Sequence, residues 1–501
     1  MKPSRRVTRP IAFTLGLTLL AGCQMAPTGT SAPATVAPST LAPMAAKATE
    51  WQVAKVGEDT QYLVEFTGDA IPANFAKEIE KAGGKVASLY DGAGIATVLS
   101  SRPDFAQKVA NLRGIQKILV DHVVYWGDRN LWCLPVDHPL RPKPGAPIPY
   151  GERQWNLQVI KAPEAWNAGA TGRGVTVAVL DSGIDYTNPE FSGQIDPRSR
   201  SFIEADGPDG NVYDILDLNG HGSHVSGIIA AKADGTGVTG VAPHAKILAL
   251  KVLNYRSVAN FDTVIKGIYY ASMNGADVIN MSLGGGFAEG DPRGEELKKT
   301  MGRAVKFAFR KGSVVVSSVG NNRTNYDTTT DFRLPAMLDH NLGVSGTGPS
   351  TGTDYDSFAS FYSNYGKRLV DLSAPGGGVI IKNGQLSPDG FIYSTWSTKA
   401  IPQTIEGMPT QAAPYFALAG TSMAAAHVSG AAALVVSKRG NLRTQPKKIV
   451  ETLFETADDL GTTGFDAYFG EGRVNAYQAV RETKTVPGLG LILRNLISRL
   501  W

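Results

Sequence analysis

From Ile160 onward, short apolar runs alternate with longer segments of helical periodicity, and this alternation limits the folds open to the chain. Residues 175–180 form an apolar run that is typical of a strand buried on both faces. Strands connected through helices run parallel, because each crossover returns the chain to the same end of the sheet. The pattern predicts an α/β fold, a mostly parallel sheet with helices on both faces. The expected strands are 175–180, 247–253, 278–281 and 313–319, and the expected helices are 224–232, 261–274, 297–311 and 423–438.

Residues 49–127 have a different rhythm. Their periodicity predicts the order β-α-β-β-α-β, which is typical of a small α+β ferredoxin-like unit. This unit contains no convincing set of catalytic residues. The expected elements are strands at 62–66, 85–90, 94–99 and 115–120, with helices at 71–82 and 105–112.

The first residues read as an export signal over 1–22. A positively charged start is followed by an apolar stretch at 11–20, which is shorter than a typical membrane-spanning helix. The stretch ends in Leu-Ala-Gly-Cys at 20–23, which looks like the lipobox of a bacterial lipoprotein. We therefore expect an exported bacterial protein whose precursor is held on a membrane by lipid on Cys23. The alternative is an ordinary secretory signal with a chance cysteine.

Three further segments read as connections or ends. Residues 23–48 are rich in Ala, Pro, Thr and Ser and predict a flexible tether. Residues 128–150 hold six prolines, so we expect an exposed linker that joins neither sheet nor helix. Residues 485–501 form an amphipathic tail, either a helix packed on the domain before it or one lying on a membrane. Cys133, the second of only two cysteines, has no disulfide partner if Cys23 is lipidated.

The formal net charge is only +4 over 501 residues, without a Lys/Arg run or a stacking platform. Nucleic acid is therefore not an expected partner.

Four polar residues lie where predicted elements begin or end. Asp181 directly follows the first strand of the sheet, at the edge where α/β sites form. His221 opens a glycine-rich helix start, Asn321 follows a strand, and Ser422 precedes an alanine-rich helix. Singly, each has a structural interpretation, such as a turn residue or a helix N-cap. His221 and His224 lack the HExxH pattern or Cys cluster that would favour a metal pair.

Together, the local frames of these residues resemble the signatures of the subtilase family. They read Asp-Ser-Gly-Ile-Asp at 181–185, His-Gly-Ser-His-Val-Ser-Gly at 221–227 and Gly-Thr-Ser-Met-Ala at 420–424. Their order, Asp then His then Ser, is also that of subtilisin. The resemblance implies a subtilisin-like peptidase domain over 151–484. It also implies that residues 49–127 are an inhibitory prodomain, with Val-Asp-His-Val at 120–123.

The resemblance further implies a secreted serine endopeptidase, made as an inhibited precursor that processes itself. Ser422 would attack the peptide bond while His221 takes its proton and Asp181 orients the imidazole. Asn321 and the Ser422 backbone N–H would bind the oxyanion. Catalysis of this kind needs no cofactor.

The expected partners are polypeptide substrates and the chain's own prodomain, and we expect a monomer. Residues 280–285, Asn-Met-Ser-Leu-Gly-Gly, resemble the family's substrate-binding strand. Ser282, Leu283 and Gly284 would then pair with the substrate backbone as an added strand.

Glu190 and Asp234 stand where the family often holds a structural calcium ion. Two carboxylates with the carbonyls of the 233–238 loop suit calcium's preference for oxygen ligands. A solvent-facing acidic turn remains the alternative.

The chain departs from the family pattern at Ala426, where a proline is usual, and in the length of the segments between Asp181 and His221 and over 286–298. These segments would border the cleft, so they put substrate preference in doubt and leave the chemistry unchanged.

Two other functions compete with a peptidase. A non-enzymatic binding module would be expected to lack a catalytic residue, and none is missing. A lipase or esterase would need Gly-x-Ser-x-Gly, and the frame at Ser422 is different.

Overall fold

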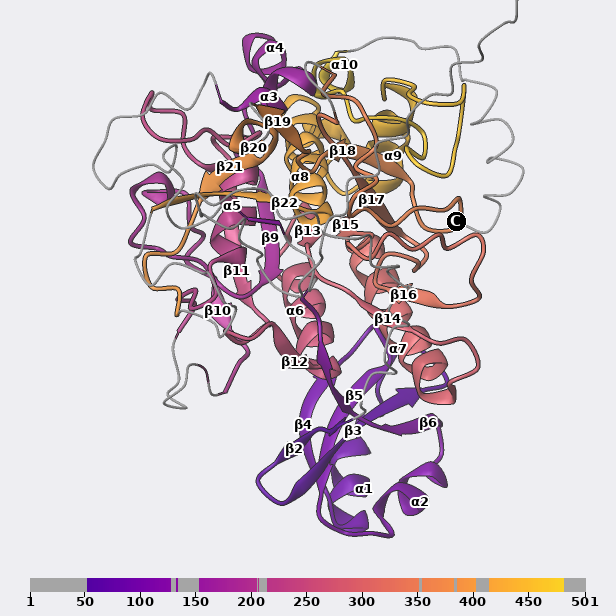
Figure 1. Ribbon diagram of the computed structural model, residues 1–501. Coiled ribbons are helices and arrows are strands. Elements are labelled where there is room, and N and C mark those ends of the chain that lie inside the picture. The colour runs from indigo at the N-terminus through magenta and orange to yellow at the C-terminus, as the bar shows by residue number, and fades with distance from the viewer. Residues whose placement is uncertain are drawn as a thin grey trace, which may run out of the picture.

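The computed structural model describes residues 52–127, 132–133, 153–204, 206, 214–350, 354–382, 385–401 and 414–481. The N-terminal residues form a small unit that lies against one end of a larger α/β unit (Figure 1). The predicted signal, tether, Cys23 and tail lie outside the described residues.

The N-terminal unit has the predicted order β-α-β-β-α-β. Its antiparallel sheet runs β4-β5-β3-β6. Side chains alternate between the two faces of a strand, so Tyr62 and Val64 pack under the helices while Leu63 faces the larger unit. The elements are β3 (Asp59–Phe66), α1 (Phe75–Ala82), β4 (Lys85–Tyr90), β5 (Ile95–Ser100), α2 (Phe105–Ala110) and β6 (Ile115–Val120).

The larger unit is built on a seven-stranded sheet in which every neighbouring pair is parallel. This confirms the predicted α/β class. The chain order reverses around β9, which lies inside the sheet and carries Asp181 at its carboxyl end. In spatial order the strands are β10 (Arg200–Ser201), β11 (Lys246–Lys251), β9 (Thr176–Asp181), β13 (Val278–Met281), β15 (Val314–Ser318), β17 (Asn341–Thr347) and β18 (Leu372–Pro375).

Helices cover both faces of this sheet, as Figure 1 shows. On one face, α5 (His221–Ala230) and α8 (Thr421–Lys438) share a core with Val177 and Val179. On the other, α6 (Phe261–Met273) and α7 (Pro292–Arg310) share one with Ala178 and Leu180. The continuous apolar run of β9 is explained by this burial on both sides.

Small sheets and short helices complete the described part of the chain. The strands are β1 (Gln52–Val53), β2 (Lys55–Val56), β7 (His122–Tyr125), β8 (Trp132–Cys133), β12 (Val258–Asn260), β14 (Gly285–Phe287), β16 (Phe332–Leu334), β19 (Ile380–Lys382), β20 (Gln385–Ser387), β21 (Ile392–Thr395) and β22 (Tyr415–Ala419). The helices are α3 (Trp155–Val159), α4 (Ala162–Asn167), α9 (Pro446–Glu455) and α10 (Ala476–Val480), with 3₁₀ turns at Pro189–Phe191, Pro388–Gly390 and Gly440–Leu442.

The structure corrects one expectation about the proline-rich segment. The backbone of β8 pairs with β22, so part of 128–150 does join a sheet. The pairing is compatible with the composition because Trp132 and Cys133 precede the first proline, Pro135, and both keep a backbone N–H. Apart from these two, residues 128–150 lie outside the described part.

Within the described ranges, no helix combines the length and the apolar character needed to cross a bilayer.

Candidate active site

Asp181 and His221 are brought together by the end of β9 and the start of α5. His221 Nδ1 lies 2.9 Å from Asp181 Oδ1 and 3.0 Å from Oδ2. The carboxylate is buried and also accepts a 2.7 Å hydrogen bond from the Ser182 backbone N–H. Gly220 caps the helix at a φ of 102°, where a side chain would strike the Trp396 ring. The glycine therefore allows α5 to begin at His221, three residues earlier than the predicted range of 224–232.

Ser422 lies in the first turn of α8, which begins at Thr421 and runs on without interruption through Ala426. Gly420 is the N-cap, so the N-cap interpretation of Ser422 is wrong. Ser422 Oγ donates to the Ser282 carbonyl at 3.2 Å, and Ser282 Oγ donates to the Ser422 carbonyl at 2.8 Å. The hydroxyl thus lies where the helix N-terminus provides positive potential.

Asn321 is held beside this helix start by Thr421. Its Oδ1 accepts bonds from the Thr421 backbone N–H and from Thr421 Oγ1, both at 2.9 Å. The Gly320 N–H donates to Thr421 Oγ1 at 3.0 Å. With Oδ1 committed to Thr421, the orientation of the amide is set, and Nδ2 is its donor end.

Ser282, Leu283 and Gly284 follow β13, one strand away from β9. Asn280 Nδ2 donates to Ser282 Oγ at 3.0 Å, which fixes the segment against α8. The Gly284 N–H donates at 2.9 Å to the carbonyl of Trp126, the residue after β7. The predicted substrate-binding segment therefore holds backbone from the N-terminal unit.

Trp126 and β12 are site features that the sequence reasoning missed. Antiparallel pairing joins β7 to β12, with Tyr125 opposite Val258. The Trp126 side chain is fully buried, with its ring centroid 5.1 Å from that of Phe261, and its Nε1 donates to the Ala259 carbonyl at 3.2 Å. A tryptophan three residues after the Val-Asp-His-Val stretch is the signal that could have pointed to it.

Two buried histidines lie behind the site. Burial, followed by the charge of nearby His221, lowers the pKa of His224 to about 3. Burial lowers the pKa of His427 to about 4, and its ring bonds Asn156 and the Met423 carbonyl. Both therefore stay neutral near pH 7. Across the described ranges, no three His, Cys, Asp or Glu side chains gather as a metal site would require.

The proposed calcium ligands fit such an ion only in part. Glu190 is buried, Tyr415 donates to its Oε1 at 2.6 Å, and burial is the main reason its pKa is raised. The carboxylate of Asp234 is already occupied, by the Lys232 ammonium at 2.9 Å and by Thr236 Oγ1 at 2.7 Å. Of the two predicted ligands, only Glu190 is not paired with a lysine in this way.

Comparison with known proteins agrees with this arrangement. The sequence model described as "Subtilase family" matches residues 172–472, a range that includes Asp181, His221, Asn321 and Ser422. Thermitase of Thermoactinomyces vulgaris is 34% identical over 333 residues, which are 66% of this chain and 97% of that protein. The "Thermophilic serine proteinase" of Bacillus sp. (strain AK1) is also 34% identical, over 66% of this chain and 68% of its own length.

Among solved structures, the epidermin leader peptide processing serine protease of Staphylococcus aureus superposes with a TM-score of 0.65 at 21% identity. The superposition covers 86% of this chain and 100% of that one, and it supports the fold. The family match spans more than half of the chain. The chain therefore belongs to the subtilase family and is a serine-type endopeptidase.

Proposed function

We propose that Asp181, His221 and Ser422 are the catalytic triad of a secreted endopeptidase that works through an acyl-enzyme. The observation that carries this proposal is the direct contact of the Asp181 carboxylate with His221 Nδ1. That contact leaves Nε2 as the basic nitrogen and stabilises the imidazolium that forms during attack.

In the proposed reaction, Ser422 Oγ turns from the Ser282 carbonyl and gives its proton to His221. The Oγ attacks the scissile carbonyl, and the resulting oxyanion accepts bonds from Asn321 Nδ2 and the Ser422 N–H. His221 then protonates the leaving amine, and water releases the acyl group by the reverse steps. The start of α8 supports this assignment, because its positive potential favours the developing negative charge.

A fluorophosphonate probe tests the nucleophile. We expect the wild type to be labelled at Ser422 and the Ser422→Ala variant to lose both labelling and hydrolysis. Ser437→Ala is the matched control, since Ser437 lies near the far end of the same helix and bonds Gly172. An unlabelled, inactive wild type would favour the non-enzymatic binding module.

The N-terminal unit is proposed to be an inhibitor that occupies the cleft until the connecting segment is cut. Two described strands support this. β7 leads to Trp126, which bonds Gly284 at the expected substrate strand. β8 pairs with β22, whose last residue, Ala419, lies shortly before Ser422. Backbone before and after 128–131 therefore pairs with segments that adjoin the proposed site, which supports self-processing between Gly127 and Trp132.

Sequencing the N-terminus of the processed enzyme tests this location. We expect it to begin within 128–132 in the wild type and the Ser422→Ala chain to stay uncut. A mature N-terminus outside 128–132, without an earlier product that begins there, would rule out the proposed cut.

Cys23 is proposed to carry the lipid, so that the anchor belongs to the inhibitor and the cut separates it from the protease. Cell fractionation of wild type, Ser422→Ala and Cys23→Ala tests this. We expect a short released form from the wild type and a full-length membrane form from Ser422→Ala, whereas Cys23→Ala keeps the triad and should be cut with neither piece on the membrane. Equal membrane binding of an uncut wild type and Ser422→Ala would point to a permanently tethered protease.

A further inference from the structure

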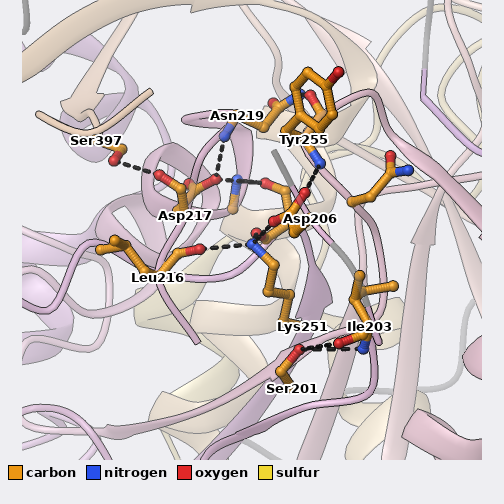
Figure 2. Close-up of polar contacts among 12 residues, drawn as sticks. Ser201, Ile203, Asp206, Leu216, Asp217, Asn219, Lys251, Tyr255 and Ser397 are labelled. Atoms are coloured by element: carbon orange, nitrogen blue, oxygen red, sulfur yellow. Dashed lines mark hydrogen bonds and ion pairs between the residues drawn. The ribbon is translucent and has the colours of Figure 1, made fainter. Parts of the chain in front are cut away.

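A buried lysine lies next to the proposed triad and has no part in the reaction described above. Lys251 is the last residue of β11, and its side chain is fully enclosed, with 0% exposure. Lysine is seldom buried without partners for its charge. Its Nζ donates to the carbonyls of Ser182 at 2.9 Å and Leu216 at 2.6 Å and pairs with Asp206 Oδ2 at 2.5 Å. Figure 2 shows the ammonium between Leu216 and Asp206.

The two carbonyls belong to the segments that carry Asp181 and His221. Ser182 directly follows Asp181, and Leu216 lies in the segment that leads into α5. The Lys251 backbone lies opposite Asp181 in the sheet, so the lysine reaches both segments from a rigid strand. Its ammonium therefore sets the spacing between the end of β9 and the approach to His221.

Asp217 ties the same segments a second time. Its Oδ1 accepts from Ser182 Oγ at 2.9 Å and from the Gly220 N–H at 2.8 Å. Its Oδ2 accepts from the Ser223 N–H at 2.8 Å, inside the first turn of α5. Ser182 is thus held at its carbonyl by Lys251 and at its hydroxyl by Asp217.

Asp206 adds charge balance. Its side chain is 1% exposed, and its Oδ1 accepts from the Tyr255 N–H at 2.7 Å. An uncompensated ammonium at this place would oppose the positive charge that His221 gains during catalysis. A carboxylate in contact with the ammonium cancels most of that field.

We propose that Lys251 and Asp206 form a positioning pair for the Asp181–His221 couple, in which Lys251 fixes the spacing and Asp206 neutralises the lysine. This rests on the proposed function of Asp181 and His221. Among the described residues, the other charged or titratable groups near His221 include Asp181, Asp185, Asp217 and His224. They are unchanged in the variants below.

Lys251→Met tests the spacing. We expect kcat on a labelled unfolded protein substrate to fall about ten- to a hundredfold with KM nearly unchanged, because the catalytic groups lose their alignment. Lys246→Met is the matched control at the exposed end of β11, where Lys246 Nζ donates to the Gly193 carbonyl. We expect it to retain wild-type kcat. Wild-type kcat in folded Lys251→Met would overturn the spacing role.

Asp206→Asn tests whether Asp206 neutralises the charge of Lys251. The readout is the pH dependence of kcat/KM, which a purely structural role of Asp206 would leave unchanged. The uncompensated Lys251 should disfavour protonated His221, so the acidic limb of the kcat/KM–pH profile should shift to lower pH by about 0.5 unit. The double variant Lys251→Met/Asp206→Asn removes both charges. We expect its limb to return to the wild-type position while kcat stays low.

The acidic limb of the pH profile can also be measured from the rate of fluorophosphonate labelling. Only molecules with a reactive Ser422 are labelled. The measurement therefore decides the question even if a variant folds in low yield. A limb of Asp206→Asn that coincides with the wild type would overturn the charge role. Failure of the proposed function is distinct, because the wild type itself would then be neither labelled nor active.

Discussion

At the scale of single residues, the proposed site is assembled where strands and helices end: Asp181 ends β9, His221 begins α5, and Ser422 lies in the first turn of α8. Asn321 follows β15, which ends at Ser318. The order of these four residues and their positions near element ends were predicted from the sequence. Lys251 and Asp206 were not predicted. A lysine ending a strand normally reads as exposed, and their partners are distant in sequence. Only the folded chain shows that they meet.

Replacing Asn321 tests the oxyanion assignment. Asn321→Ala should fold normally and lose about 10²–10³-fold in kcat, the size of effect known when a subtilisin loses one such donor. Asn322→Ala is the matched control, because its side chain is exposed and its backbone N–H makes the bond to Asn364. Steady-state kinetics on one substrate compares the two. Full kcat in Asn321→Ala would contradict the assignment.

At the scale of elements, periodicity found the N-terminal unit, four strands of the large sheet and the helices α5 to α8, but it did not find β17, β18, β22 or α9. It missed β8 and β12, because strands of two or three residues have no period to detect. Their pairing depends on partners far along the chain, β22 for one and β7 for the other. For this reason, the sequence predicted only part of the contact between the N-terminal unit and the cleft.

A buried carboxyl pair joins the two units at the start of α6. Asp121, between β6 and β7, accepts from Gln61 Nε2 at 2.7 Å and from the Asp262 N–H at 3.3 Å. Tyr90 donates to Asp262 Oδ1 at 2.5 Å. Burial, followed by the Asp262 charge, raises the pKa of Asp121 to about 7. The docked state thus keeps a proton that an exposed aspartate releases near pH 4.

Docking should weaken as pH rises between about 4 and about 7 and then level off, because the raised pKa means that only the docked carboxyl holds its proton in that window. Denaturant unfolding of Ser422→Ala, which we expect to stay uncut, measures the trend. The Ser422→Ala/Asp121→Asn chain is the control, since asparagine cannot ionise, and its stability should fall less over the same range. Superimposable pH profiles would refute this coupling.

At the scale of the whole molecule, the α/β class was predictable because strands buried on both faces of a parallel sheet are continuous apolar runs. The family resemblance came instead from the residue frames at 181–185, 221–227 and 420–424. The docking of residues 52–127 against α6 and α7 was not predicted from composition. It depends on complementary faces, such as Leu63 packing into the core of the larger unit. Neither face has a sequence pattern that identifies the surface against which it packs.

Calcium binding at Glu190 would appear as a change in global stability. An ion held only by the folded state adds about 2.7 kcal/mol when its free concentration is about 100 times Kd. Chelator should therefore lower the Tm of the wild type. Glu190→Gln should respond less, whereas Asp234→Asn should behave like the wild type, since Asp234 is already paired with Lys232. A Tm that does not change when chelator is added would rule out calcium binding at Glu190.

The arrangement of β7 and β8 around the start of α8 also determines what cutting the chain can and cannot achieve. On the proposed function, the first peptide bond to be cut belongs to the enzyme's own chain and is present at a fixed local concentration. Its cleavage is therefore first order and independent of how much protein the cell makes. Cleavage alone does not free the cleft, because the β7–β12 ladder and the buried Trp126 remain in place on the amino side of the cut. Activity would begin only when the two pieces diffuse apart or the inhibitor is digested. The timing of activation is then set by dissociation and dilution, with the cut as its precondition.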